Sequence, residues 1–141
     1  MNVQHRLRAV LIASFVVAAA AAQAHHSFSG AFDINRQVTL KGVISKIDWV
    51  NPHVYLYLDV KDDAGAVTSW AIESLPTNHL RTAGITRADL WNNASAGEIV
   101  TVNVYGARDP KVRAGWLLRI TYADGHFLHL SGDPNELASS K

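Results

Sequence analysis

Apolar and polar residues alternate most regularly between positions 53 and 60. The even positions are Val or Leu, and the odd positions are His, Tyr or Asp. A period of two places successive side chains on opposite faces of a strand. We therefore predict a strand over 53–60 with one buried face, preceded by a turn at Asn51-Pro52.

The same period predicts further strands over 38–49, 67–73, 98–105, 116–122 and 126–130. In the first of these, apolar residues move from even positions (Val38, Leu40) to odd positions (Val43, Ile47, Trp49), and Gly42 lies at the switch. A change of parity within a strand is typical of a β-bulge, which we predict at Gly42. In 116–122, the residues expected on one buried face are Trp116, Leu118, Ile120 and Tyr122.

Residues 74–97 lack this period and predict a short helical insertion. We expect one helix over 77–83, ended by Gly84, and a second over 86–91. Thr86 and Asp89 have the spacing of a capping box. Strands on both sides of a helical insertion, with a bulged first strand, predict a mainly β fold: a small OB-like barrel of five to six antiparallel strands. The alternative is an open antiparallel sandwich of immunoglobulin type.

The turn Asp63-Ala64-Gly65 fixes how the strands 53–60 and 67–73 pair. It suits a three-residue hairpin loop with glycine in the left-handed position. With the apolar faces aligned, Tyr55 lies opposite Glu73. His53 is then a diagonal neighbour of Glu73, at about 7–8 Å.

The first 24 residues have the pattern of a cleaved secretory signal. A basic start is followed by an apolar run from Ala9 to Ala22, and Ala22-Gln23-Ala24 is a small-residue cleavage site. The expected organisation is a signal peptide over 1–24, an N-terminal arm over 25–36, the β domain over 37–130 and a flexible tail over 131–141. The expected location is the periplasm, with no membrane span after cleavage.

Signal removal changes the composition that matters for function. Of the 141 residues, 117 remain, and Lys plus Arg fall from 13 to 11 against 12 acidic residues. A formal charge of −1 without a basic run argues against nucleic acid as a partner. The mature chain has neither Cys nor Met, so a bound copper ion would be Cu(II) held by nitrogen and oxygen. The large apolar side chains expected in the core are Trp49, Trp70, Trp91 and Trp116.

Cleavage after Ala24 leaves His25 as the first residue, with an α-amine and a ring nitrogen that can chelate one metal ion. His53 is the best candidate for a further ligand, with Glu73 on the same face. His26 ranks lower, because consecutive extended residues point to opposite sides. The candidate metal ligands are therefore His25, His53, His26 and Glu73, for Cu(II) or Zn(II).

Tyr55 and Tyr57 share the face of His53 and form a candidate ligand face. His79, in the helical insertion, is expected to be solvated, and at most one of His126 and His129 can join a site. No catalytic residue is assigned, because the chain has no cysteine nucleophile, no GxSxG motif and no phosphate-binding loop.

Four short motifs resemble a group of short exported bacterial proteins, a domain of unknown function. They are His25-His26-Ser27-Phe28, Val38-Thr39-Leu40-Lys41-Gly42, Trp49-Val50-Asn51-Pro52-His53 and Trp70-Ala71-Ile72-Glu73. The resemblance extends from His25 to about Leu130. It implies an exported protein of a Gram-negative bacterium and brings no activity with it.

Three hypotheses for function follow from these residues. The first is a β-barrel binding module for a small molecule or an envelope protein. The second is a periplasmic protein that binds Cu(II) or Zn(II) through the N-terminal histidine. The third, ranked last, is a copper enzyme of the oxidase or monooxygenase type.

Overall fold

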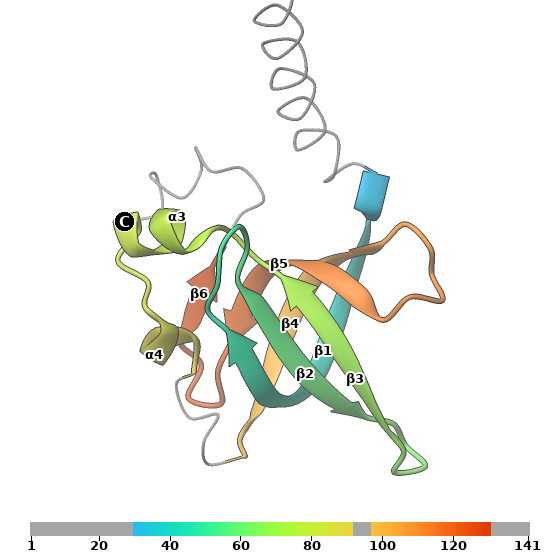
Figure 1. Ribbon diagram of the computed structural model, residues 1–141. Coiled ribbons are helices and arrows are strands. Elements are labelled where there is room, and N and C mark those ends of the chain that lie inside the picture. The colour runs from blue at the N-terminus through green and yellow to red at the C-terminus, as the bar shows by residue number, and fades with distance from the viewer. Residues whose placement is uncertain (1–29, 92–96, 131–141) are drawn as a thin grey trace, which may run out of the picture. The chain divides into compact units, whose positions relative to one another are not determined.

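The computed structural model describes residues 30–91 and 97–130 (Figure 1). Nearly all of them belong to the second of two compact units, which are residues 1–31 and 32–141. The predicted signal peptide, His25, His26 and the predicted tail over 131–141 lie outside the described residues. None of the helices in the described segments is long and apolar enough to cross a membrane.

The fold is mainly β, as predicted. The strands are β1 (Phe32–Asp48), β2 (Tyr55–Lys61), β3 (Val67–Glu73), β4 (Ile99–Ala107), β5 (Ala114–Thr121) and β6 (Phe127–His129). All six form one sheet in the order β3-β2-β1-β4-β5-β6, whereas the sandwich alternative requires two sheets.

One strand pair joins the two ends of this order. Ala71, Ile72 and Glu73 of β3 pair with Ala114, Gly115 and Trp116 of β5 in parallel, and every other pair is antiparallel. The first five strands are therefore hydrogen-bonded in a closed order, β1-β2-β3-β5-β4-β1. No sequence pattern predicts this parallel pair.

The bulge in β1 lies at Ser45, so the prediction of a bulge at Gly42 is wrong. Gly42 pairs regularly with Val100, and the register with β2 shifts between Ile44 and Lys46. Ile44 is 2% exposed, so the buried positions stay even-numbered from Leu40 to Ile44, and Val43 is not the buried residue that the sequence predicted. A glycine is required at 42 for space, because a Cβ there would lie 2.4 Å from the carbonyl oxygen of Asp59.

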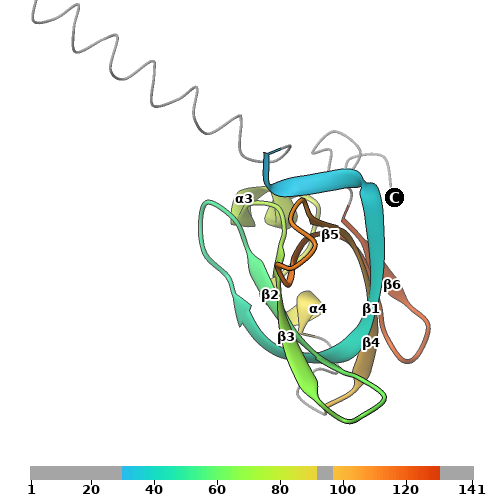
Figure 2. The same cartoon turned by 90° about the vertical axis from the view of Figure 1, so that its right-hand side faces the viewer.

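β1 also begins earlier than the expected start at Val38. Its first residue, Phe32, pairs with Ala107, and an irregularity separates this pair from the regular ladder that starts at Gln37. Figure 2 shows how β1 curves, running beside β4 and then beside β2.

The predicted hairpin between β2 and β3 is confirmed. Gly65 has a φ of +88°, and Tyr55 lies opposite Glu73. His53 itself precedes β2, which begins at Tyr55. The register therefore places the side chains of Tyr55, Tyr57 and Glu73 on one outward face.

Two short helices separate β3 from β4, α3 (Thr77–Thr82) and α4 (Arg87–Leu90). Gly84 follows α3 with a φ of +77°. Thr86 and Asp89 form the predicted capping box, in which the Asp89 carboxylate accepts from the backbone N–H of Thr86 at 2.7 Å. The helices bury Leu80 and Leu90.

A second irregularity, between Asn103 and Val104, changes which residues of β5 face the core. Leu117 pairs with Val104 and is 1% exposed, so Leu117 and not Leu118 is the core residue. Trp116 therefore faces outward, in contrast to the prediction. The core residues that are at most 1% exposed include Leu56, Leu58, Ile72, Val100, Val102, Val104, Leu117 and Ile120.

Of the four tryptophans expected in the core, Trp70 and Trp116 are buried, and Trp49 and Trp91 are half-buried.

Candidate functional site

The candidate site is centred on a contact between the side chains of His53 and Glu73. His53 follows the cis peptide bond Asn51-Pro52 in the loop before β2, and Glu73 is the last residue of β3. Nδ1 of His53 contacts Oε1 of Glu73. Two residues that the sequence predicted to be diagonal neighbours are thus in direct contact.

Tyr55 is the second partner of the Glu73 carboxylate. It lies directly opposite Glu73 in the hairpin register. Burial raises the pKa of the Tyr55 hydroxyl, and the negative charge of Glu73 and a hydrogen bond with Glu73 raise it further. The hydroxyl of Tyr55 and the carboxylate of Glu73 are thus near neighbours on the outward face.

An aromatic contact holds the other side of the imidazole. The His53 ring meets Trp116 edge-on, with ring centroids 5.6 Å apart and an interplanar angle of 89°. Trp116 in turn contacts Phe32, at 5.9 Å between centroids. Although Trp116 faces outward from the sheet, it is only 6% exposed, because these two side chains cover it.

The pair itself remains accessible to solvent. The side chain of His53 is 29% exposed and that of Glu73 is 19% exposed. An ionised carboxylate only accepts hydrogen bonds, so Nδ1 of His53 is the donor in this contact. Within residues 30–91 and 97–130, no group of three or more His, Cys, Asp or Glu side chains could hold a metal ion.

Tyr57 shares the outward face but has different partners. The Nζ atom of Lys46 lies 5.0 Å from the centroid of the Tyr57 ring and 2.8 Å from Oδ2 of Asp48. The hydrogen bond from Lys46 holds the pKa of Asp48 below its usual value, and a hydrogen bond with Tyr57 lowers it further. The predicted ligand face is thus a row of two tyrosines. Glu73 lies beside Tyr55, and the Lys46–Asp48 ion pair lies beside Tyr57.

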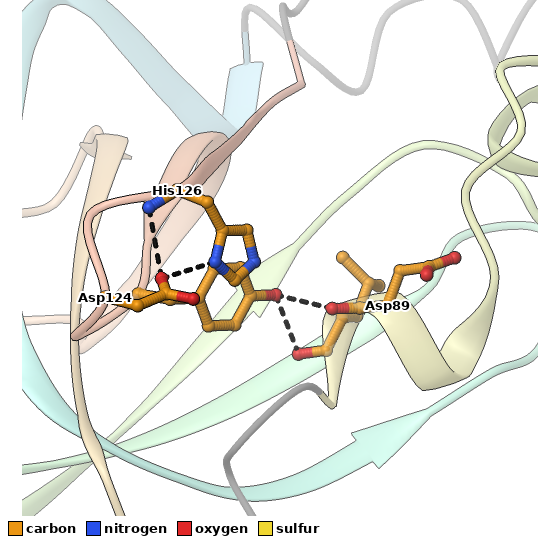
Figure 3. Close-up of polar contacts among 5 residues, drawn as sticks. Asp89, Asp124 and His126 are labelled. Carbon is orange, nitrogen blue, oxygen red and sulfur yellow. Dashed lines mark hydrogen bonds and ion pairs between the residues drawn. The ribbon is translucent and has the colours of Figure 1, made fainter.

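A second histidine cluster lies in the turn between β5 and β6 (Figure 3). Nδ1 of His126 contacts Oδ1 of Asp124, and the His126 ring stacks on Tyr122 at 4.3 Å. The Tyr122 hydroxyl donates to the carbonyl oxygens of Asp89, at 2.7 Å, and Leu90. Burial raises the pKa of Tyr122. These contacts connect the β5–β6 turn to α4, which is a structural role.

Among residues 30–91 and 97–130, the remaining histidines are not brought to the site. His79 is an exposed residue of α3, and His129 is an exposed residue of β6. Two contacts were not predicted from the sequence, that of Trp116 with His53 and that of Phe32 with Trp116. The adjacent apolar residues Leu117 and Leu118 were the available signal, since they make the buried parity of β5 ambiguous.

The fold and site define a mainly β protein that presents a histidine–carboxylate pair at the end of β3, where β3 pairs with both β2 and β5. The profile of the Family of unknown function (DUF6152) matches residues 12–116, and the chain belongs to this family. No curated protein and no solved structure matches the chain.

Proposed function

We propose that the protein is an exported binding protein with an OB-like barrel, and that its ligand site is the His53–Glu73 pair. The closed strand order β1-β2-β3-β5-β4-β1 and the helical insertion between β3 and β4 support the barrel. Export to the periplasm is supported by the basic start, the apolar run and the Ala22-Gln23-Ala24 sequence.

The ligand that this site supports best is a Cu(II) or Zn(II) ion. The observation that carries the proposal is the contact between Nδ1 of His53 and Glu73, because it leaves Nε2 as the ligating nitrogen. Histidines that bind metals commonly donate their other ring N–H to a carboxylate in this way.

The N-terminal histidine of the mature chain supplies the remaining nitrogens. Seven residues from His25 to Phe32 span at most about 25 Å. Phe32 and His53 both contact the ring of Trp116, with centroid distances of 5.9 Å and 5.6 Å. The chain is therefore long enough for the amine and ring of His25 to meet Nε2 of His53. With neither Cys nor Met available, Cu(II) binds such nitrogens more tightly than Zn(II).

A second candidate is a metal-free site for a small molecule or an envelope protein on the outward face of β2. The half-buried side chains of Tyr55 and Tyr57 favour it, since their rings offer flat apolar surface beside polar groups.

Metal titration of the protein that begins at His25 tests the first candidate. His53→Ala should lower Cu(II) affinity at least tenfold, because it removes a ligand. His79→Ala is the matched control, because His79 is exposed on α3, and it should leave affinity unchanged. If the unsubstituted protein does not bind Cu(II), or if both variants bind it equally well, the metal proposal is wrong. Ligand binding that persists after chelator treatment would favour the second candidate.

A further inference from the structure

We propose that Arg119 is the centre of an anion-binding site on the outward face of β4, β5 and β6, with Asn103 and Phe127 as its other parts. The ligand class is an oxyanion, presented as a carboxylate or a phosphate group. The site shares no residue with the His53–Glu73 pair, and the proposal does not rest on the proposed function.

The strand registers place Arg119 in a row of polar side chains across the sheet. Its direct partner in β4 is Asn103, and its direct partner in β6 is His129. Asn103 in turn lies opposite Thr39 of β1. Ile120, the next residue of β5, is 0% exposed, so Arg119 points to the outward face. Because directly opposite residues have Cβ atoms about 4.5–5.5 Å apart, this row is continuous over the neighbouring strands β1, β4, β5 and β6 (Figure 1).

The ring of Phe127 holds the Arg119 side chain in place. Cζ of Arg119 lies 3.8 Å from the centroid of the Phe127 ring, a close cation–π contact. Nε of Arg119 is buried and has no hydrogen-bond partner among the described residues. The donors left for a ligand are therefore those of the two Nη atoms. A guanidinium that is already fixed in this way loses little conformational freedom when it binds.

The charge around Arg119 is positive and uncompensated. Within residues 30–91 and 97–130, the ion pairs join other residues, and Arg119 takes part in none of them. The next row on the same face also lacks a carboxylate, since it consists of Lys41, Thr101, Thr121 and Phe127. A half-buried arginine without a counter-charge attracts an anion more strongly than a fully solvated one.

Asn103 adds a neutral donor beside the guanidinium. Its Nδ2 atom donates to Oγ1 of Thr39 at 2.9 Å, which leaves the second N–H of the same amide for a ligand. The two Nη atoms of an arginine match the two oxygens of a carboxylate or of a phosphate edge. Donors from two adjacent strands, with no acidic side chain between them, fit an oxyanion and disfavour a cation.

Nuclear magnetic resonance titration with sodium phosphate and with sodium acetate, at constant ionic strength, tests the site. The protein is the form that lacks residues 1–24, which belong to the other compact unit. We expect saturable shifts of the Arg119 side-chain Nε–H signal and of the backbone amides of Arg119 and Asn103. Phosphate should bind more tightly, because it has more charge and more acceptor oxygens. Binding of only one of the two anions would support the site and assign its ligand class.

Two substitutions of Arg119 and a matched control separate this site from a general charge effect. Arg119→Gln should lower anion affinity at least tenfold, and Arg119→Lys should lower it less, because lysine keeps the charge and loses the planar pair of donors. Arg113→Gln is the control and should bind as wild type does. Arg113 also lies over an aromatic ring, that of Trp70 at 5.7 Å, but it is exposed.

Three results would overturn the proposal. They are no saturable shift at Arg119 with either anion, equal affinity in wild type and Arg119→Gln, and equal losses in Arg119→Gln and Arg113→Gln. Circular dichroism melting of each variant checks that the fold is retained. If Arg119→Gln does not fold, Arg119→Lys provides the comparison, and wild-type affinity in that variant would overturn the paired hydrogen bonds from the guanidinium.

Discussion

Replacement of Gly42 by alanine should destabilise the domain through a clash between two strands. An ideal Cβ at position 42 would lie 2.4 Å from the carbonyl oxygen of Asp59, 2.9 Å from its carbonyl carbon and 3.1 Å from Cγ of Leu58. The close atoms of Asp59 are backbone atoms of β2, so no rotamer change relieves the contact. β2 must move by roughly 1 Å to restore normal van der Waals separation.

The expected cost follows from two opposing terms. Overpacking of a buried position costs about 1–3 kcal/mol. Alanine recovers about 0.4–1 kcal/mol by restricting the unfolded chain. From the midpoints of these ranges the net loss is about 1.3 kcal/mol, which lowers the Tm of a domain of this size by roughly 5–10 °C.

Thermal and urea unfolding followed by circular dichroism measure this loss. Gly30→Ala is the matched control, because a Cβ there meets no atom within 4 Å, and its Tm should not change. A wild-type Tm for Gly42→Ala would refute the close approach of β1 and β2. It would also weaken the account of the site, since β2 carries Tyr55 and follows His53.

The other predictions concern β5 and the helical insertion. Leu117→Ala should lower the free energy of unfolding by about 2–5 kcal/mol, and Leu118→Ala should lower it clearly less, because Leu117 is 1% exposed and Leu118 is half-buried. Urea unfolding of both variants measures the difference, and equal losses would contradict the irregularity in β5. Hydrogen bonds from Thr86 hold the pKa of Asp89 below its usual value. The cap therefore stabilises the fold fully at pH values above the unfolded-state pKa of about 3.9. This stabilisation is lost as the pH falls through the lower folded-state pKa. Asp89→Ala should therefore lose less stability than wild type between about pH 6 and pH 3, as measured by denaturant unfolding, and parallel curves would contradict this role. Tyr122→Phe should cost about 0.5–1.5 kcal/mol in the same assay, because its hydroxyl donates to the carbonyl oxygens of Asp89 and Leu90, and an unchanged stability would contradict those bonds.

Local patterns predicted the parts of the fold that are governed by local chemistry. The alternation in β2, the loop at Gly65 and the capping box at Thr86 each depend on neighbouring residues, and each was predicted correctly. The pairing of Tyr55 with Glu73 followed from the loop length, because a short hairpin loop fixes the register. This is why the proximity of His53 and Glu73 could be predicted from the sequence.

The failures occur where distant strands decide the outcome. Val43-Ile44 and Leu117-Leu118 are adjacent apolar pairs, and local periodicity does not say which member faces the core. The partner strands decide, through the bulge at Ser45 and the irregularity in the β4–β5 register. The same irregularity turns Trp116 outward beside His53. The parallel pairing of β3 with β5 is also non-local, and no local turn motif predicts it.

The most direct test of the proposed function compares Cu(II) affinity for two forms of the protein that lack residues 1–24. One form begins at His25, and the other carries a single additional alanine before His25. The extension moves the α-amine away from the His25 ring and leaves the described domain unchanged. The account predicts that the extended form loses at least tenfold in Cu(II) affinity. Equal affinity in the two forms would contradict it, because the N-terminal amine would then not be a ligand.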